Sequence, residues 1–175
     1  MRHFSKGRKS YDSGGRWAAR GRVIEPLLAE LLAHPFFKSR PPKSAGREQF
    51  GAEFLKRFFE SRRIVPPEDL LRTATELSAQ TIVRALERFV LGKVKIHRLI
   101  VSGGGAHNRF LMSRLADLLP TLRVHRSDDF GLDVDAKEAI AFALLADRTL
   151  HSLPGNLPSV TGARRAVVLG QISRP

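Results

Sequence analysis

The segment Leu99–Asn108 constrains the fold most strongly, because a short apolar run leads directly into three consecutive glycines. A helix-like pattern follows from Asn108 to Leu119, so we predict a strand, a glycine turn and a helix in that order. The glycines Gly103–Gly105 can adopt positive φ and leave room for a ligand close to the backbone. The first amides of the next helix would favour a polar or anionic ligand. Two interpretations stay open from this segment alone: a turn required only for packing, and a ligand cradle.

The spacing of apolar residues predicts helices on both sides of this turn. Before it, helices are expected over residues 23–33, from an N-cap at Ser44 to 60, and from 66 to 92. After it, we expect a strand at 122–126 parallel to the first, a helix at 136–150 and a short final strand at 167–170. The predicted fold class is therefore α/β, helix-rich with a small mixed sheet.

The third of these helices is more polar than the core of a helix bundle requires. Its polar residues either form a solvated face or line a cleft, and the sequence leaves both open. They are Thr73, Thr75, Ser78, Gln80 and Thr81.

The chain is strongly basic, with 30 Lys and Arg against 17 Asp and Glu and a net charge of +13. Residues 1–22 contribute seven of the basic residues, are rich in Gly and Ser, and contain Asp12 as their one acidic residue. We therefore expect a solvated, mobile arm over 1–22 and a folded domain over 23–175. Because such an arm suits polyanions, a basic nucleic-acid-binding module is the alternative function. No nucleic-acid motif supports it, so we do not expect a nucleic-acid partner.

Several classes of site are excluded or not assigned. The absence of cysteine excludes disulfides, thiolate metal ligands and cysteine nucleophiles, and fits a cytoplasmic protein. No window reaches the roughly 18 apolar residues of a membrane span, so no membrane association is expected. The six histidines lack metal-ligand spacing, and no catalytic triad is present. The acidic cluster Asp128, Asp129, Asp133 and Asp135 either binds Mg²⁺ or is solvated. We assign no catalytic residue and no metal ligand.

Five segments, in chain order, closely resemble the bacterial anhydro-N-acetylmuramic acid kinases. The resemblance covers roughly residues 11–173, and the combination of segments is far more specific than the glycine triplet alone. The segments are Tyr11–Gly21, Pro41–Phe50, Leu99–Asn108, Asp135–Ala143 and Leu153–Gly162.

The resemblance implies a fold of the sugar kinase, Hsp70 and actin superfamily, in which two α/β lobes close on ATP. It implies an ATP- and Mg²⁺-dependent transferase of peptidoglycan recycling and amino-sugar catabolism. Such an enzyme opens the ring of 1,6-anhydro-N-acetylmuramic acid with water and phosphorylates O6. On this resemblance the nucleotide-binding residues are Gly103, Gly104, Gly105 and Asn108, and Glu138 is a sugar contact.

The sequence also departs from the family. The family's Gly-Thr-Ser-x-Asp-Gly phosphate turn and its Asp-x-Gly-Pro-Gly-Asn segment with the catalytic base do not occur in these 175 residues, and Ala45 replaces a usual threonine. Phosphoryl transfer needs positioned phosphates and a base for the attacking water. We therefore expect the C-terminal lobe of an actin-like ATPase fold, as a truncated, incomplete or split enzyme that is inactive alone. Its partner would be a missing N-terminal lobe or a second copy.

Overall fold

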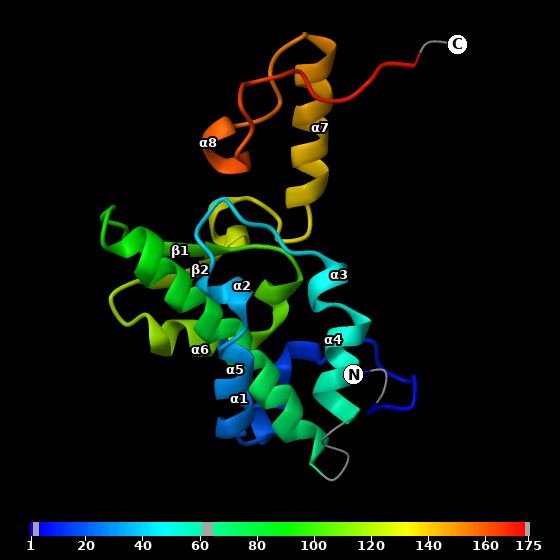
Figure 1. Ribbon diagram of the computed structural model, residues 1–175, viewed down its shortest axis with the longest axis vertical. Coiled ribbons are helices and arrows are strands. Elements are labelled where there is room, and N and C mark those ends of the chain that lie inside the picture. Colours follow the sequence, from blue (N-terminus) through cyan, green and yellow to red (C-terminus); the bar gives the residue numbers. More distant parts are fainter. Residues whose placement is uncertain (2–3, 61–64, 174–175) are drawn as a thin grey trace.

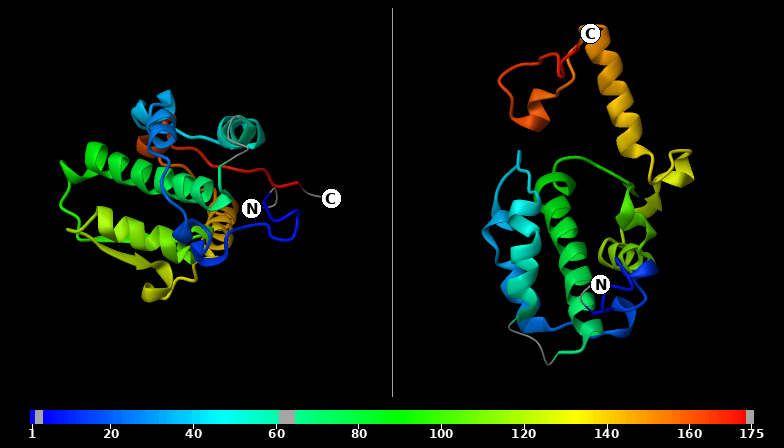
Figure 2. Two further views of the ribbon diagram at one scale, coloured as in Figure 1. Left: turned by 90° about the horizontal axis from the view of Figure 1, so that it is seen from below. Right: turned by 90° about the vertical axis from the view of Figure 1, so that its right-hand side faces the viewer.

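Helix α5 (Pro67–Leu86) lies at the centre of the computed structural model, which describes residues 1, 4–60 and 65–173. Figure 1 shows it crossing the body of the molecule, and the left view of Figure 2 shows it between α1 (Glu25–Leu32) and α6 (Arg109–Leu118). Pro67 and the acidic residues Glu68 and Asp69 occupy its first turn, where a fixed φ and negative charge are favoured. The predicted helix end at Gly92 is confirmed, since α5 continues into a π-helical turn, η3 (Glu87–Leu91), whose C-cap is Gly92.

Two hydrophobic clusters share α5. On one side it packs against α1 (Glu25–Leu32) and α4 (Ala52–Glu60). The buried residues of this cluster are Leu27, Leu31, Phe58 and Leu70. On the other side it packs against α6 (Arg109–Leu118), around Ala79, Val83, Leu115, Leu119 and Leu122. Because both clusters rest on α5, this helix fixes the position of α6 relative to α1.

The predicted strand, turn, helix and strand are confirmed. β1 (Arg98–Val101) pairs in parallel with β2 (Arg123–Arg126), with Arg98 opposite Arg123 and Val101 opposite Arg126. The turn η4 (Gly104–His107) and α6 form the crossover between them, as parallel strands require.

The predicted third strand at 167–170 is wrong. The backbone of Val167 forms its hydrogen bonds with a loop and not with a strand. Its carbonyl accepts from the Gly155 amide (3.0 Å), and its amide donates to Asn156 Oδ1 (2.7 Å). The described sheet therefore has two parallel strands and is not mixed.

The predicted N-cap at Ser44 is also wrong. Between α2 (Pro35–Lys38) and α4, the helical turn α3 (Arg47–Phe50) begins after Gly46. The Gly46 amide donates to Glu48 Oε1 at 2.8 Å. Gly51 has non-helical dihedrals and separates α3 from α4, so the expected single helix is two.

The segment expected to be a mobile arm contains ordered turns packed on the body. These are η1 (Ser13–Gly15) and η2 (Ala18–Arg20), and Gly15 and Ala18 are buried. The η2 turn contacts α5. Net charge and Gly content do not reveal this packing, because it depends on a few specific contacts with residues distant in the sequence.

Helix α7 (Lys137–Leu150) and the turn α8 (Pro158–Thr161) stand away from the body (Figures 1 and 2). No residue of α7 is buried. Its large apolar side chains are exposed: Ile140 by 51%, Phe142 by 71% and Leu144 by 57%. Contiguous exposed apolar side chains of this kind are uncommon on the surface of a soluble domain and are typical of surfaces that contact another element.

Candidate nucleotide site

A cavity of about 1020 Å³ lies where the N-terminal segment, α5 and α6 meet. We call it the central cavity. One wall is the turn Ser10–Gly14, a second is a stripe of α5, and the third is the end of the glycine turn with the start of α6. Three segments that are far apart in the sequence therefore enclose one space large enough for a nucleotide-sized ligand.

The glycine turn Gly103–Gly105 leaves open space in front of its backbone. Only Gly103 has a positive φ, of 80°. Its amide donates to the Val134 carbonyl at 2.7 Å, and its carbonyl accepts from the Ala106 amide at 2.9 Å. A Cβ at Gly103 or Gly104 would meet nothing within 4 Å, and one at Gly105 would meet only Leu111 Cδ2, at 3.6 Å. Close packing therefore does not explain Gly104 or Gly105, and the ligand cradle stays a prediction.

Asn108 joins the glycine turn to α6. Its amide donates to the Gly105 carbonyl (3.1 Å), and its side-chain oxygen accepts from the Leu111 amide (3.0 Å). Asn108 is thus the N-cap of α6. The η4 turn leaves its own first N–H groups without partners inside the turn. Gly104, Gly105 and Asn108 all line the central cavity, so polar backbone and an amide side chain border the same space.

The α5 wall explains part of that helix's unusual polarity. Leu71, Thr75 and Ser78 line the cavity at one helical stripe. The Thr75 hydroxyl donates to the Leu71 carbonyl (2.9 Å) and the Ser78 hydroxyl to the Ala74 carbonyl (3.0 Å). Both hydroxyl oxygens can still accept a hydrogen bond from a ligand.

Thr73, by contrast, is fully buried and accepts from the Ile24 amide at 3.0 Å. This hydrogen bond joins Ile24, the N-cap residue of α1, to α5. The polar residues of α5 therefore have at least two different roles.

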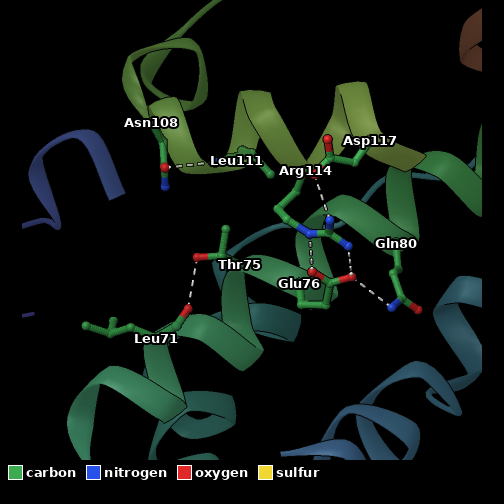
Figure 3. A network of polar contacts seen from close by, with 8 residues as sticks. All are labelled: Leu71, Thr75, Glu76, Gln80, Asn108, Leu111, Arg114 and Asp117. Atoms are coloured by element: carbon green, nitrogen blue, oxygen red, sulfur yellow. Dashed lines mark hydrogen bonds and ion pairs between the residues drawn. The ribbon is translucent and has the colours of Figure 1, made fainter. Parts of the chain in front are cut away.

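An ion pair ties α5 to α6 beside the cavity. Figure 3 shows Arg114 of α6 reaching the carboxylate of Glu76 on α5. Glu76 is only 4% exposed. The hydrogen bond from Arg114 holds the pKa of Glu76 below its ordinary value, and the same bond raises the pKa of Arg114. The charged pair is thereby stabilised between the two helices that form two of the cavity walls.

The acidic residues near β2 do not converge on one point. Asp128 pairs with Arg126 and accepts from the Val134 amide (2.8 Å). Asp135 is 3.0 Å from His107 Nε2. Within the described ranges, no group of three or more His, Asp or Glu side chains is arranged to hold a metal ion.

Comparison with known proteins identifies the relatives of this chain. A family model described as anhydro-N-acetylmuramic acid kinase matches residues 1–175. The chain belongs to this kinase family. Three curated relatives named anhydro-N-acetylmuramic acid kinase illustrate the match. The relative from Francisella tularensis subsp. novicida is 46% identical over 165 residues, which are 94% of this chain and 43% of the relative.

The other two relatives give a similar picture. The one from Pasteurella multocida is 47% identical over 165 residues, 94% of this chain and 43% of its own length. The one from Caldanaerobacter subterraneus subsp. tengcongensis is 38% identical over 175 residues, 99% of this chain and 44% of its own length. The resemblance stated from the sequence is confirmed. The chain spans less than half the length of these kinases.

In this kinase family member the predicted site residues fall into two places. Gly103, Gly104, Gly105 and Asn108 lie together at the turn bordering the central cavity. Glu138 does not line it and lies exposed in the first turn of α7.

The sequence assigned no role to three arginines that do line the cavity: Arg16, Arg109 and Arg126. A signal for Arg109 was present, since it is the first residue of the helix after the glycine turn. Arg16 and Arg126 are brought to the cavity only by the tertiary structure. No helix in the described part of the chain is both long and apolar enough to cross a bilayer.

Proposed function

We propose that this chain forms the C-terminal lobe of an anhydro-N-acetylmuramic acid kinase with an actin-like ATPase fold, and that the central cavity receives the adenosine end of ATP. The open glycine turn is the observation that supports this most directly. Gly104 and Gly105 border a cavity of about 1020 Å³, and the space in front of their backbone is not filled by side chains. A nucleotide can therefore approach peptide groups directly.

In this proposal Gly103–Gly105 and Asn108 contact the nucleoside and its first phosphate. The arginines at the cavity, Arg16, Arg109 and Arg126, supply positive charge for the phosphate chain. Glu138 remains the proposed sugar contact, because its carboxylate is exposed three residues after Asp135, which borders the cavity. Mg²⁺ would enter bound to the phosphates of ATP, and we assign it no ligand among the described residues.

The proposed reaction of the complete enzyme is the opening of 1,6-anhydro-N-acetylmuramic acid by water with phosphorylation of O6. This reaction belongs to cytoplasmic peptidoglycan recycling, where ATP is available. It requires a phosphate turn and a base for the attacking water, and neither family motif occurs in these 175 residues. We propose that this chain alone binds nucleotide but does not catalyse phosphoryl transfer.

The exposed surface of α7 supports the need for a further lobe. Ile140, Phe142 and Leu144 present apolar area that isolated soluble domains rarely leave uncovered. The two-stranded parallel sheet supports it as well, because parallel sheets are normally wider and covered on both faces. An N-terminal lobe is the proposed cover, and a second copy is the alternative.

Two measurements on the chain test this proposal. Binding of mant-ADP, the fluorescent N-methylanthraniloyl derivative of ADP, should be saturable and displaced by unlabelled ATP. Phosphorylation of anhydromuramic acid should be absent until the N-terminal half of the Francisella tularensis relative is supplied as a separate chain. Turnover at a normal rate by this chain alone would refute the incomplete-enzyme proposal, and absence of nucleotide binding would refute the cavity assignment.

A further inference from the structure

We propose that Asp12 and Gly15 are positioning residues of the nucleotide site, and that they act by seating the turn Ser10–Gly15 against Asn108. This inference rests on the proposed nucleotide cavity and adds a role for a segment that has none assigned. Residues 10–14 of the turn line the same cavity as Gly104 and Gly105. Its shape therefore decides the width of the space into which a nucleotide fits.

Asp12 holds the turn in shape. Its carboxylate accepts hydrogen bonds from the Trp17 amide, at 3.0 and 3.1 Å, and from the Ala18 amide, at 2.9 Å. The Gly15 amide donates to the Asp12 carbonyl at 3.0 Å. A carboxylate that accepts several backbone N–H groups is a strong, charge-assisted anchor. The end of the turn and the residues that follow it are thereby held by one residue.

The segment after the turn is fastened to α5. The Arg22 amide donates to Asp69 Oδ1 at 2.7 Å, and the Ile24 amide donates to the buried Thr73 hydroxyl at 3.0 Å. Ala18 is 1% exposed. The turn therefore projects from a fixed base and is not free to move away from the cavity as a loose loop would.

Gly15 brings the turn into direct contact with α6. It is buried, with φ of 71°. A Cβ at this position would lie 2.1 Å from Asn108 Oδ1 and 2.6 Å from Phe110 Cβ. These separations are far below van der Waals contact, so only glycine fits here. Any side chain must displace either the turn or the start of α6.

Asn108 transmits that contact to the glycine turn. Its side-chain oxygen, the atom that a Cβ at Gly15 would meet first, also caps α6 by accepting from the Leu111 amide. Its amide closes the glycine turn on Gly105. A displacement of Asn108 therefore breaks an N-cap and shifts the backbone that borders the cavity. Gly15 therefore affects the position of a bound ligand through Asn108 and need not contact the ligand itself.

The test compares mant-ADP affinity among matched variants of the chain. In Gly15→Ala we expect affinity to fall by about tenfold or more, since the cap and the turn geometry are disturbed together. Gly7→Ala is the control: Gly7 also has a positive φ, of 82°, but a Cβ there would meet nothing within 4 Å. It introduces the same kind of backbone strain without the contact, and its affinity should stay within about twofold of the wild type.

Two further variants separate positioning from general stability. Asp12→Asn keeps the shape of the side chain but removes its charge, so it should weaken mant-ADP binding several-fold while the protein stays folded. In the Gly15→Ala background, Asn108→Ser shortens the capping side chain and keeps a capping oxygen. The fold loss of affinity caused by Gly15→Ala should therefore be smaller in an Asn108→Ser background than in the wild type, a coupling that a merely destabilising substitution would not show.

The outcomes distinguish this inference from the proposed function. Lack of mant-ADP binding by the wild type would overturn both. Wild-type binding with unchanged affinity in folded Gly15→Ala, or in Asp12→Asn if Gly15→Ala does not fold, would overturn the positioning role alone. Equal losses in Gly15→Ala and Gly7→Ala would also overturn it, because backbone strain would then be the cause.

Discussion

Arg114 and Glu76 form a two-point ion pair between α6 and α5, with 2.9 Å from Nε to Oε2 and 3.2 Å from Nη2 to Oε1. Gln80 donates a further hydrogen bond to Oε1 at 3.0 Å. Asp117 accepts from Nη1 of the same arginine at 2.9 Å, but from an exposed position (Figure 3). Both oxygens of the buried carboxylate are therefore hydrogen-bonded, and the two helices that border the cavity are joined at a fixed spacing.

Glu76→Gln is expected to destabilise the fold by about 2–4 kcal/mol, because it leaves the guanidinium of Arg114 without its buried counter-charge. Asp117→Asn removes the exposed partner of the same arginine and should cost about 1 kcal/mol or less. Urea denaturation at neutral pH measures both. Similar losses in the two variants would contradict the unequal roles of the two carboxylates.

The same pair predicts an acid dependence of stability. The pKa of Glu76 is held below its ordinary value of 4.5 by the hydrogen bond from Arg114, so the folded state binds the proton less readily than the unfolded state. The stabilisation is complete above the ordinary value and is lost as the pH falls through the lowered folded value.

The unfolding free energy of the wild type and of Glu76→Gln should therefore converge as the pH is lowered from 7 toward 3. A constant difference between them across that range would argue against the ionised pair.

Adjacent glycines of the turn should respond differently to alanine. Gly103 has φ 80° and ψ −176°, a conformation open almost only to glycine, so Gly103→Ala should cost about 1–3 kcal/mol of stability. Gly104 has no positive φ and its Cβ would enter open space. Gly104→Ala should change stability little and weaken mant-ADP binding, because its methyl group occupies the border of the cavity. Thermal unfolding and fluorescence titration separate the two effects.

The exposed surface of α7 should make the isolated chain associate with itself at high concentration. Phe142 and Leu144 are 71% and 57% exposed, and replacing both by serine should lower the average mass in light scattering. Leu55→Ser on α4 is the matched control, since Leu55 is 45% exposed but lies on another helix. A monomeric wild type at high concentration would contradict this prediction.

The order strand, glycine turn, helix and strand could be predicted because each element is encoded within a few residues. Asn108 caps α6 through a contact three residues away, and the parallel pairing of β1 with β2 follows from a helical crossover. The predictions that failed lacked such local determinants. The helical turn that we expected to begin at Ser44 begins after Gly46. The segment 167–170 bonds to a loop and does not pair with a strand.

The sequence by itself determined the family, the βαβ unit and the glycine turn, since these depend on local order and spacing. Only the tertiary structure decided that the turn Ser10–Gly14, the polar stripe of α5 and the start of α6 border one cavity. The contact between Gly15 and Asn108 joins residues distant in the chain. No periodicity or composition encodes such a contact, because it arises only when separate elements pack on α5.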